Sequence, residues 1–268
     1  MRGLCLPGLN FQMRILILGD VVGEPGRRLM EAHLPELRRE FAVDFLVVNG
    51  ENAAHGNGIT ERIAVDWFDN LGVDVITTGN HAFDVKDIGP YFAKEPRLLR
   101  PANFPPGTPG LGHVKLHTKG GEEVLVMCLM GRIHMPTCDD PFRSADSILM
   151  KERADVVLVD MHAEATSEAQ AMGWYLEGRV SAVVGTHTHV ATLNTKVLPG
   201  GTAYVTDIGM TGPYDSVIGM KKETSLARFL TPQRPRFEVA EGDLQLHAVL
   251  IETKGKKAIS IERIVRKL

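Results

Sequence analysis

Two histidines separated by one residue, His187 and His189, have the clearest capacity for chemistry in this sequence. They follow a short apolar run at residues 182–184, which predicts a buried strand, and Gly185 is expected to end that strand. Side chains two residues apart in an extended segment point the same way, so both imidazoles are expected to face one side. Such a pair can bind one metal ion, or one ion each of a close pair. The alternative is two surface histidines in a loop, and the pair alone does not decide between these interpretations.

Four other apolar runs are also followed by side chains that commonly bind metals. In chain order these are Asp20, Glu51 with Asn52, Asn80 with His81, and His162. Each group alone is weak evidence, because an Asp after a strand is often a turn residue and a lone His is more often structural. Ligands of open α/β sheets bind beyond the carboxyl ends of the strands, so these polar groups can converge at one edge. The ordered series therefore predicts a shared metal site.

Strands that alternate with helices must position these groups. Apolar runs predict strands over residues 14–19, 45–48, 73–76, 124–129, 155–159, 182–184 and 203–206. A helix is expected over residues 60–71, and another begins at Ser167, where Gln170 gives a capping-box spacing. Two alternating segments, 244–252 and 258–264, predict an antiparallel hairpin that turns at Gly255. The pattern indicates a layered α/β domain with mixed sheets.

Length and composition limit the class of protein. A chain of 268 residues that is 44% hydrophobic can bury a large core. Its net charge of -3 gives no bulk attraction to nucleic acid or to anionic membranes, so an anionic substrate needs a local positive site. The three cysteines follow neither a disulfide framework nor a zinc spacing, which favours reduced thiols and a cytoplasmic location. No apolar run approaches the ~20 residues of a membrane-spanning helix.

The domain organisation is expected to be simple. Residues 1–12 are interpreted as an N-terminal leader without signal-peptide features, and this leader need not be native because Met13 can serve as the natural start. Residues 13–268 are expected to form a single domain, since no repeat, linker or low-complexity tract divides them. Association into a homo-oligomer is left open.

The ordered polar series resembles the motifs of the calcineurin-like metallophosphoesterases. The matching segments are Gly19-Asp20, Gly50-Glu51-Asn52, Gly79-Asn80-His81, His162 and His187-Thr188-His189. Three departures matter: Val22 replaces the His of the first motif, Glu51 replaces the bridging Asp, and Asp84 falls two places late in the third motif. These departures, together with the segment at residues 206–213 (TDIGMTGP), are features that the sequence shares with the YmdB-like phosphodiesterases. The sequence resembles that branch over nearly the whole chain from Met13.

This resemblance implies a layered α/β sandwich of two mixed β-sheets flanked by helices, and a dinuclear metal-dependent phosphodiesterase that hydrolyses 2′,3′-cyclic nucleotides. The implied metal ligands are Asp20, Glu51, Asn52, Asn80, His162, His187 and His189. Glu51 would bridge the two ions, and Asn52 would supply the ligand that Val22 cannot. His81 would act as general acid while a metal-bridging hydroxide attacks phosphorus. Carboxylate, amide and imidazole ligands without thiolate favour iron or manganese.

Alternatives remain open at this point. The same dinuclear site could serve a phosphomonoesterase or protein phosphatase, or the chain could be a non-catalytic metal-binding regulator that interacts with RNA. The expected partner is a small cyclic nucleotide phosphodiester, with no membrane and no stable nucleic-acid binding. His81 could instead orient the substrate without acting as an acid. His55 and the pair Lys221-Lys222 are weaker candidates, which are interpreted as solvated surface groups.

Overall fold

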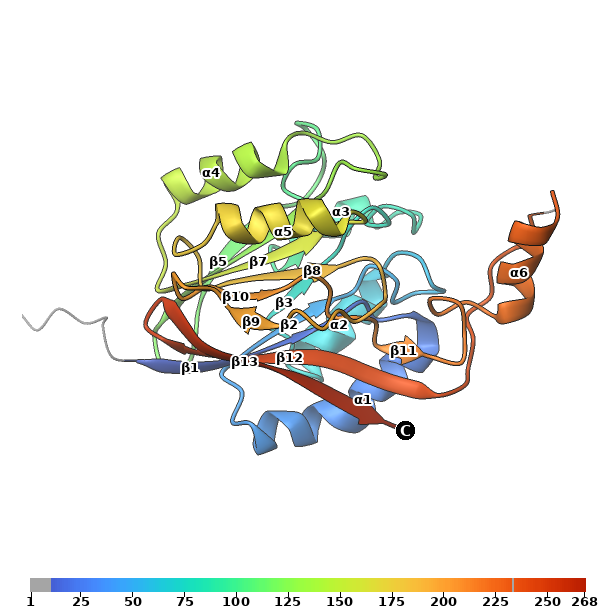
Figure 1. The fold of residues 1–268 in the computed structure, drawn as a ribbon, viewed down its shortest axis with the longest axis horizontal. Coiled ribbons are helices and arrows are strands. Elements are labelled where there is room, and N and C mark those ends of the chain that lie inside the picture. The colour runs from blue at the N-terminus through green and yellow to red at the C-terminus, as the bar shows by residue number, and fades with distance from the viewer. Residues whose placement is uncertain (1–10, 233) are drawn as a thin grey trace, which may run out of the picture.

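A computed structural model describes residues 11–232 and 234–268 of the chain, and it contains two mixed sheets packed face to face between helices (Figure 1). The first sheet has the strand order β11-β12-β1-β2-β3-β4, and β13 pairs with β12. Its strands are β1 (Gln12–Leu18), β2 (Phe45–Asn49), β3 (Val75–Thr77), β4 (Leu98–Leu99), β11 (Gly212–Pro213), β12 (Leu244–Lys254) and β13 (Lys257–Lys267). Helices α1 (Gly23–Glu40), α2 (Glu61–Asp69) and α3 (Gly89–Lys94) pack on its outer face.

The second sheet has the order β5-β6-β7-β8-β10-β9. Its strands are β5 (His113–His117), β6 (Glu123–Met130), β7 (Val156–His162), β8 (Ala182–Thr186), β9 (Lys196–Val197) and β10 (Ala203–Val205). Helices α4 (Pro141–Lys151) and α5 (Thr166–Tyr175) cover its outer face. Helix α6 (Lys222–Leu230) belongs to neither layer and projects from the body of the molecule (Figure 1).

The core lies on both faces of each sheet, and the period of the strands explains why. In β1, Ile15 and Ile17 point towards the second sheet, whereas Leu16 and Leu18 point towards α1 and α2. Because side chains alternate along a strand, a strand buried on both faces needs an almost continuous apolar run. The expected layered sandwich of two mixed sheets flanked by helices is therefore confirmed.

The hairpin is also confirmed, because β12 and β13 pair antiparallel and Gly255 occupies the turn with φ of +56°. The capping box at Ser167 is wrong: α5 begins at Thr166, its N-cap is Ala165, and no side chain caps it. The first turn is held instead by a tertiary contact, in which Glu168 accepts the backbone N–H of Arg132 at 3.0 Å.

Gly185 does not end its strand, since β8 continues through Thr186. A Cβ at position 185 would lie 1.7 Å from the carbonyl oxygen of Thr206, so glycine is required there for close approach of the chain that follows β10. Strand β1 begins at Gln12, two residues before the expected start at residue 14. The expectation for residues 1–10 lies outside the described residues. Within the described part of the chain, no helix is both long enough and apolar enough to cross a bilayer.

Candidate metal centre

The proposed ligands gather where the carboxyl ends of five strands meet. Strands β1, β2 and β3 run parallel in the first sheet, and β7 and β8 run parallel in the second. The segments after the first three carry Asp20, Glu51-Asn52 and Asn80, while His162 is the last residue of β7. Convergence was expected at the edge of one sheet. The edges of both sheets contribute, so the site lies at the junction of the two layers.

His162 is the centre of one ligand group. Its Nε2 lies 3.2 Å from Asn80 Oδ1 and 3.0 Å from His187 Nδ1, and it makes a short contact with Glu51 Oε2. Possible ligand atoms of Glu51, His162 and His187 all lie within 4.8 Å of one another. One nitrogen cannot share a proton with three neighbours at once. A divalent cation among these atoms could accept a lone pair from each.

His189 is the centre of a second group beside the first. Its Nε2 lies 3.2 Å from Asn52 Oδ1 and 4.0 Å from Asp20 Oδ1. The amide of Asn52 is oriented because its Nδ2 donates to the carbonyl of Gly56 at 2.9 Å, which leaves Oδ1 directed at the imidazole. All seven residues of the predicted ligand set are therefore brought into two adjoining groups.

Hydrogen bonds on the outer side of His162 orient its ring. Asp160 Oδ1 accepts the hydroxyl of Thr186 at 2.7 Å, and the same hydroxyl oxygen lies 2.9 Å from His162 Nδ1. Since that hydroxyl proton is committed to Asp160, Thr186 accepts the Nδ1–H of His162. The lone pair of Nε2 is then free for the ligand group. Such outer partners set the tautomer and increase the basicity of metal-binding histidines.

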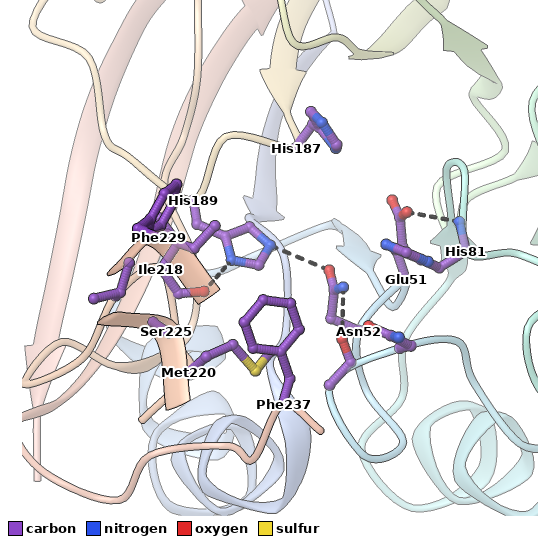
Figure 2. Close-up of a pocket in the computed structure, with 13 residues that line it drawn as sticks. Glu51, Asn52, His81, His187, His189, Ile218, Met220, Ser225, Phe229 and Phe237 are labelled. Carbon is purple, nitrogen blue, oxygen red and sulfur yellow. Dashed lines mark hydrogen bonds between the residues drawn. The ribbon is translucent and has the colours of Figure 1, made fainter. Parts of the chain in front are cut away.

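The other two histidines follow the same arrangement. His187 Nε2 lies 3.1 Å from Glu164 Oε2, so that nitrogen carries the proton and Nδ1 faces the group. His189 Nδ1 donates to the carbonyl of Ile218 at 2.8 Å, which leaves Nε2 free (Figure 2). All three imidazoles therefore present an unprotonated nitrogen to the centre, as metal binding requires.

Two buried carboxylate oxygens have no hydrogen-bond partner among the described residues, namely Asp20 Oδ1 and Glu51 Oε2. Burial raises the pKa of Asp20 to about 7 and also raises that of Glu51, whereas burial lowers the pKa of His162 and of His187 to about 4. A buried carboxylate oxygen that accepts no hydrogen bond destabilises a fold unless a cation compensates it. The donor set therefore fits divalent metal.

The two histidines of the 187–189 segment do not share one face, which corrects the expectation from extended geometry. His187 has φ of +102° and His189 has φ of +63°, so the segment is not an extended strand. Its backbone is held by Asp20, whose Oδ2 accepts the N–H of His187 at 3.0 Å. Consequently each imidazole joins a different ligand group, which favours the arrangement in which each binds its own ion.

Several supporting residues were not singled out from the sequence. Asp207 Oδ2 accepts both the N–H and the hydroxyl of Thr188, at 2.9 and 2.8 Å, and so fixes the segment between the two histidines. Asp160 supports His162 as described above. A Cβ at Gly79 would lie 2.1 Å from the ring of His162, so only glycine fits there. Two features of the sequence could have identified these aspartates: Asp160 lies two residues before His162, on the same face of the strand, and Asp207 lies within the segment at residues 206–213.

His81 stands at the edge of the centre. Its backbone N–H donates to Glu51 Oε1 at 2.8 Å (Figure 2). Its Nδ1 lies 2.7 Å from Asp84 Oδ2. The late position of Asp84 in its motif thus has a structural consequence, because this carboxylate orients the imidazole. Lys221 and Lys222 instead pair with Glu238 and Asp215, each at 2.7 Å, in agreement with a surface role.

A cavity of about 270 Å³ opens onto the two ligand groups. One side is polar and includes Glu51, Asn52 and the three imidazoles of His81, His187 and His189. The other side is apolar and comes from the region of α6, including Met220, Phe229 and Phe237 (Figure 2). An anionic group could therefore meet the polar side while an apolar part of the same molecule contacts the aromatic side.

Comparison with known proteins agrees with this geometry. The model of a family described as YmdB-like protein matches residues 16–264. A 2′,3′-cyclic-nucleotide 2′-phosphodiesterase of Bacillus subtilis is 50% identical over 259 residues, which cover 94% of this chain and 97% of that protein. The crystal structure of a hypothetical protein from Thermus thermophilus has a TM-score of 0.90 at 47% identity and covers 95% of this chain and 99% of its own. That of a novel phosphatase from Mycoplasma pneumoniae has a TM-score of 0.91 at 32% identity, covering 97% and 95%.

Proposed function

This chain belongs to the YmdB-like protein family, and from that premise we propose that it is a metal-dependent phosphodiesterase that hydrolyses 2′,3′-cyclic nucleotides. The observation that carries the proposal is the set of three histidines that present unprotonated nitrogens to two buried carboxylate oxygens without a hydrogen-bond partner, beside a cavity with an aromatic wall. The relative from Bacillus subtilis, which bears the name of this activity, covers nearly the whole chain.

Each ligand group would hold one divalent cation, with Glu51 common to both. Asp20, Asn52 and His189 would complete one site, and Asn80, His162 and His187 the other. Oxygen and imidazole ligands without thiolate favour iron or manganese. When bound, a pair of such ions supplies an activated hydroxide and neutralises the charge that develops on the phosphoryl oxygens.

His81 would protonate the leaving oxygen. In the hydrolysis of a 2′,3′-cyclic phosphate to a 3′-phosphate, an oxygen from water bonds to phosphorus and the bond from phosphorus to O2′ breaks. The proton that O2′ requires would come from His81 Nε2, because Nδ1 is engaged with Asp84 at 2.7 Å. A carboxylate on the far side of an imidazole holds it in one tautomer and stabilises its protonated form.

The proposal is tested by elemental analysis and 2′,3′-cyclic AMP hydrolysis on wild type and His189→Ala. We expect about two equivalents of metal in wild type and the loss of one equivalent in the variant. The rate of the variant should be lower by a factor of at least about 10², since it lacks a ligand. His113→Ala, a histidine on β5 outside the site, is the matched control and should retain metal and activity. Wild-type protein that carries metal but turns over only phosphomonoesters or phosphopeptides would contradict the proposal in favour of a phosphatase.

The pH dependence of metal binding offers an independent prediction. A cation that binds Asp20 must displace the proton that its raised pKa of about 7 retains in the metal-free protein. The apparent Kd for Mn²⁺ should therefore fall about tenfold per pH unit well below pH 7, about fivefold between pH 6 and 7, and level off above pH 7. The histidines with lowered pKa values are already neutral in this range and add no slope. Titration of EDTA-treated protein would measure this, and a slope that ends near pH 5 would contradict it.

A further inference from the structure

A second cleft, of about 600 Å³, adjoins the metal cavity. The two share Asn57, Met220 and Phe237 in their walls. Phe237 therefore stands between them, and the guanidinium of Arg228 lies 4.0 Å from the centroid of its ring. The cleft and the metal cavity therefore adjoin at these shared residues.

The second cleft is basic, although the chain as a whole has a net charge of -3. Arg228, Arg234 and Arg236 line it. Arg234 and Arg236 are exposed, and in the described part of the chain neither forms an ion pair with a carboxylate. Exposed guanidinium groups without partners in a concave site are suited to phosphate, which they bind with paired N–H donors.

Carboxylates around the cleft restrict where an anion can lie. Within it, Asp84 is already engaged with His81. Glu24, Glu238 and Glu241 line a neighbouring hollow, which shares Arg236 and Phe237 with the cleft. Arg236 therefore lies between the cleft and these carboxylates, whereas Arg228 and Arg234 line the cleft but not the acidic hollow.

The position of His81, the proposed general acid, restricts where the ribose of the substrate can lie. The leaving O2′ must lie at His81, so the ribose that carries it lies on the same side of the cavity. Asp84, which holds His81, is part of the cleft wall. If the 5′ side of that ribose faces the arginines, a nucleoside 2′,3′-cyclic phosphate has only a neutral 5′-hydroxyl to place there. A chain continuing in the 5′ direction would place a phosphodiester in this cleft.

We infer that the substrate class of this site is RNA whose 3′ end carries a 2′,3′-cyclic phosphate: the terminal nucleotide occupies the metal cavity, and the arginine cleft binds the preceding phosphodiester. This inference rests on the proposed function and extends it from free nucleotides to chain ends. It differs from the expectation of no stable nucleic-acid binding, which rested on net charge. Net charge describes the whole surface, whereas binding depends on the local arrangement of cations.

The test compares kcat/KM for 2′,3′-cyclic AMP with kcat/KM for the dinucleotide ApA that carries a 2′,3′-cyclic phosphate. Metal-loaded wild type should prefer the dinucleotide by about tenfold or more, because guanidinium–phosphate bonds are charge-assisted. The preference should decrease as salt increases. In Arg234→Ala/Arg236→Ala the ratio should fall to about one. Arg143→Ala/Lys151→Ala removes two exposed positive charges on α4 and should keep the wild-type ratio. A general loss of activity cancels in the ratio.

The outcomes separate the inference from the proposed function. If wild type hydrolyses both substrates with equal kcat/KM, or if the double arginine variant keeps the preference, the chain-end inference is wrong and the proposed function stands. If neither substrate is hydrolysed, the proposed function fails. The binding of a 5′-labelled tetra-adenylate with a 3′-phosphate, measured by fluorescence anisotropy, then tests whether the arginine cleft binds the RNA backbone. Equal affinity in the double arginine variant and its control would overturn this role of the cleft, and weaker affinity in the arginine variant alone would support it.

Discussion

Glu51→Gln is expected to lower kcat for 2′,3′-cyclic AMP at least about 10³-fold and to reduce the bound metal by one equivalent or more. Glu51 is the carboxylate proposed to be common to both ions, and it is almost fully buried, with no hydrogen-bond partner for Oε2. Gln keeps the size of the side chain but removes the charge on which the ligand group depends. Loss of a single preorganised electrostatic contact already costs about 10²–10³ in kcat, and here the metal is lost as well.

The stability of metal-free Glu51→Gln separates this explanation from misfolding. Burial raises the pKa of Glu51, so the charged form is disfavoured in the folded, metal-free protein. Linkage gives the direction of the pH effect on the free energy of unfolding. Glu51 contributes stability below the pKa that it has in the unfolded chain, and that contribution is lost as the pH rises through its higher pKa in the folded protein. Near pH 7, the Tm of the metal-free variant should therefore equal or exceed that of metal-free wild type. Glu61→Gln, on the exposed start of α2, is the control and should keep metal and kcat. A variant that binds two metals and turns over normally would refute the bridging role.

His81→Ala is expected to lower kcat for 2′,3′-cyclic AMP by about 10²–10⁴, while metal content stays unchanged. The imidazole lines the cavity beside the ligand groups, and its Nδ1 is held by Asp84. A ribose oxygen is a poor leaving group and needs the proton. A p-nitrophenyl diester has a good leaving group and needs it far less. Its rate should therefore fall much less than that of the cyclic nucleotide.

Asp84→Asn tests the same assignment from the other side of the ring. The amide keeps the contact with His81 but cannot stabilise the imidazolium, so the loss for 2′,3′-cyclic AMP should be smaller than that of His81→Ala, with the p-nitrophenyl diester again nearly unaffected. Equal losses on both substrates in His81→Ala would show that this residue positions the substrate and does not donate a proton.

Local patterns were sufficient for much of the fold. Continuous apolar runs predicted the central strands of both layers, although not β5 or the two-residue strands β4, β9 and β11. The alternating segments around Gly255 predicted the final hairpin, which the structure confirms. Both depend on interactions between near neighbours along the chain. The capping box at Ser167 was wrong because a tertiary contact of Glu168 anchors the first turn of that helix. Gly185 was taken as a strand terminator, but its missing side chain admits the carbonyl of Thr206.

The kinds of side chain at the centre, and their order along the chain, were determined by the sequence. Carboxylates, amides and imidazoles that follow apolar runs indicate ligands at strand ends, and this chemistry is a property of the residues themselves. Only the tertiary structure decided how they face one another. Positive φ values at His187 and His189 send the two imidazoles to different ligand groups, and Asp160 and Asp207 orient the centre from distant elements.

The arginine cleft is the clearest case of a feature decided by the fold alone. Arg234 follows α6 and Asp84 follows β3, about 150 residues apart in the chain, yet both line one cleft. Neither position carries a pattern in the sequence that points to the other. Side-chain chemistry is encoded locally, whereas the direction of each side chain depends on backbone torsions and packing that only the folded chain imposes.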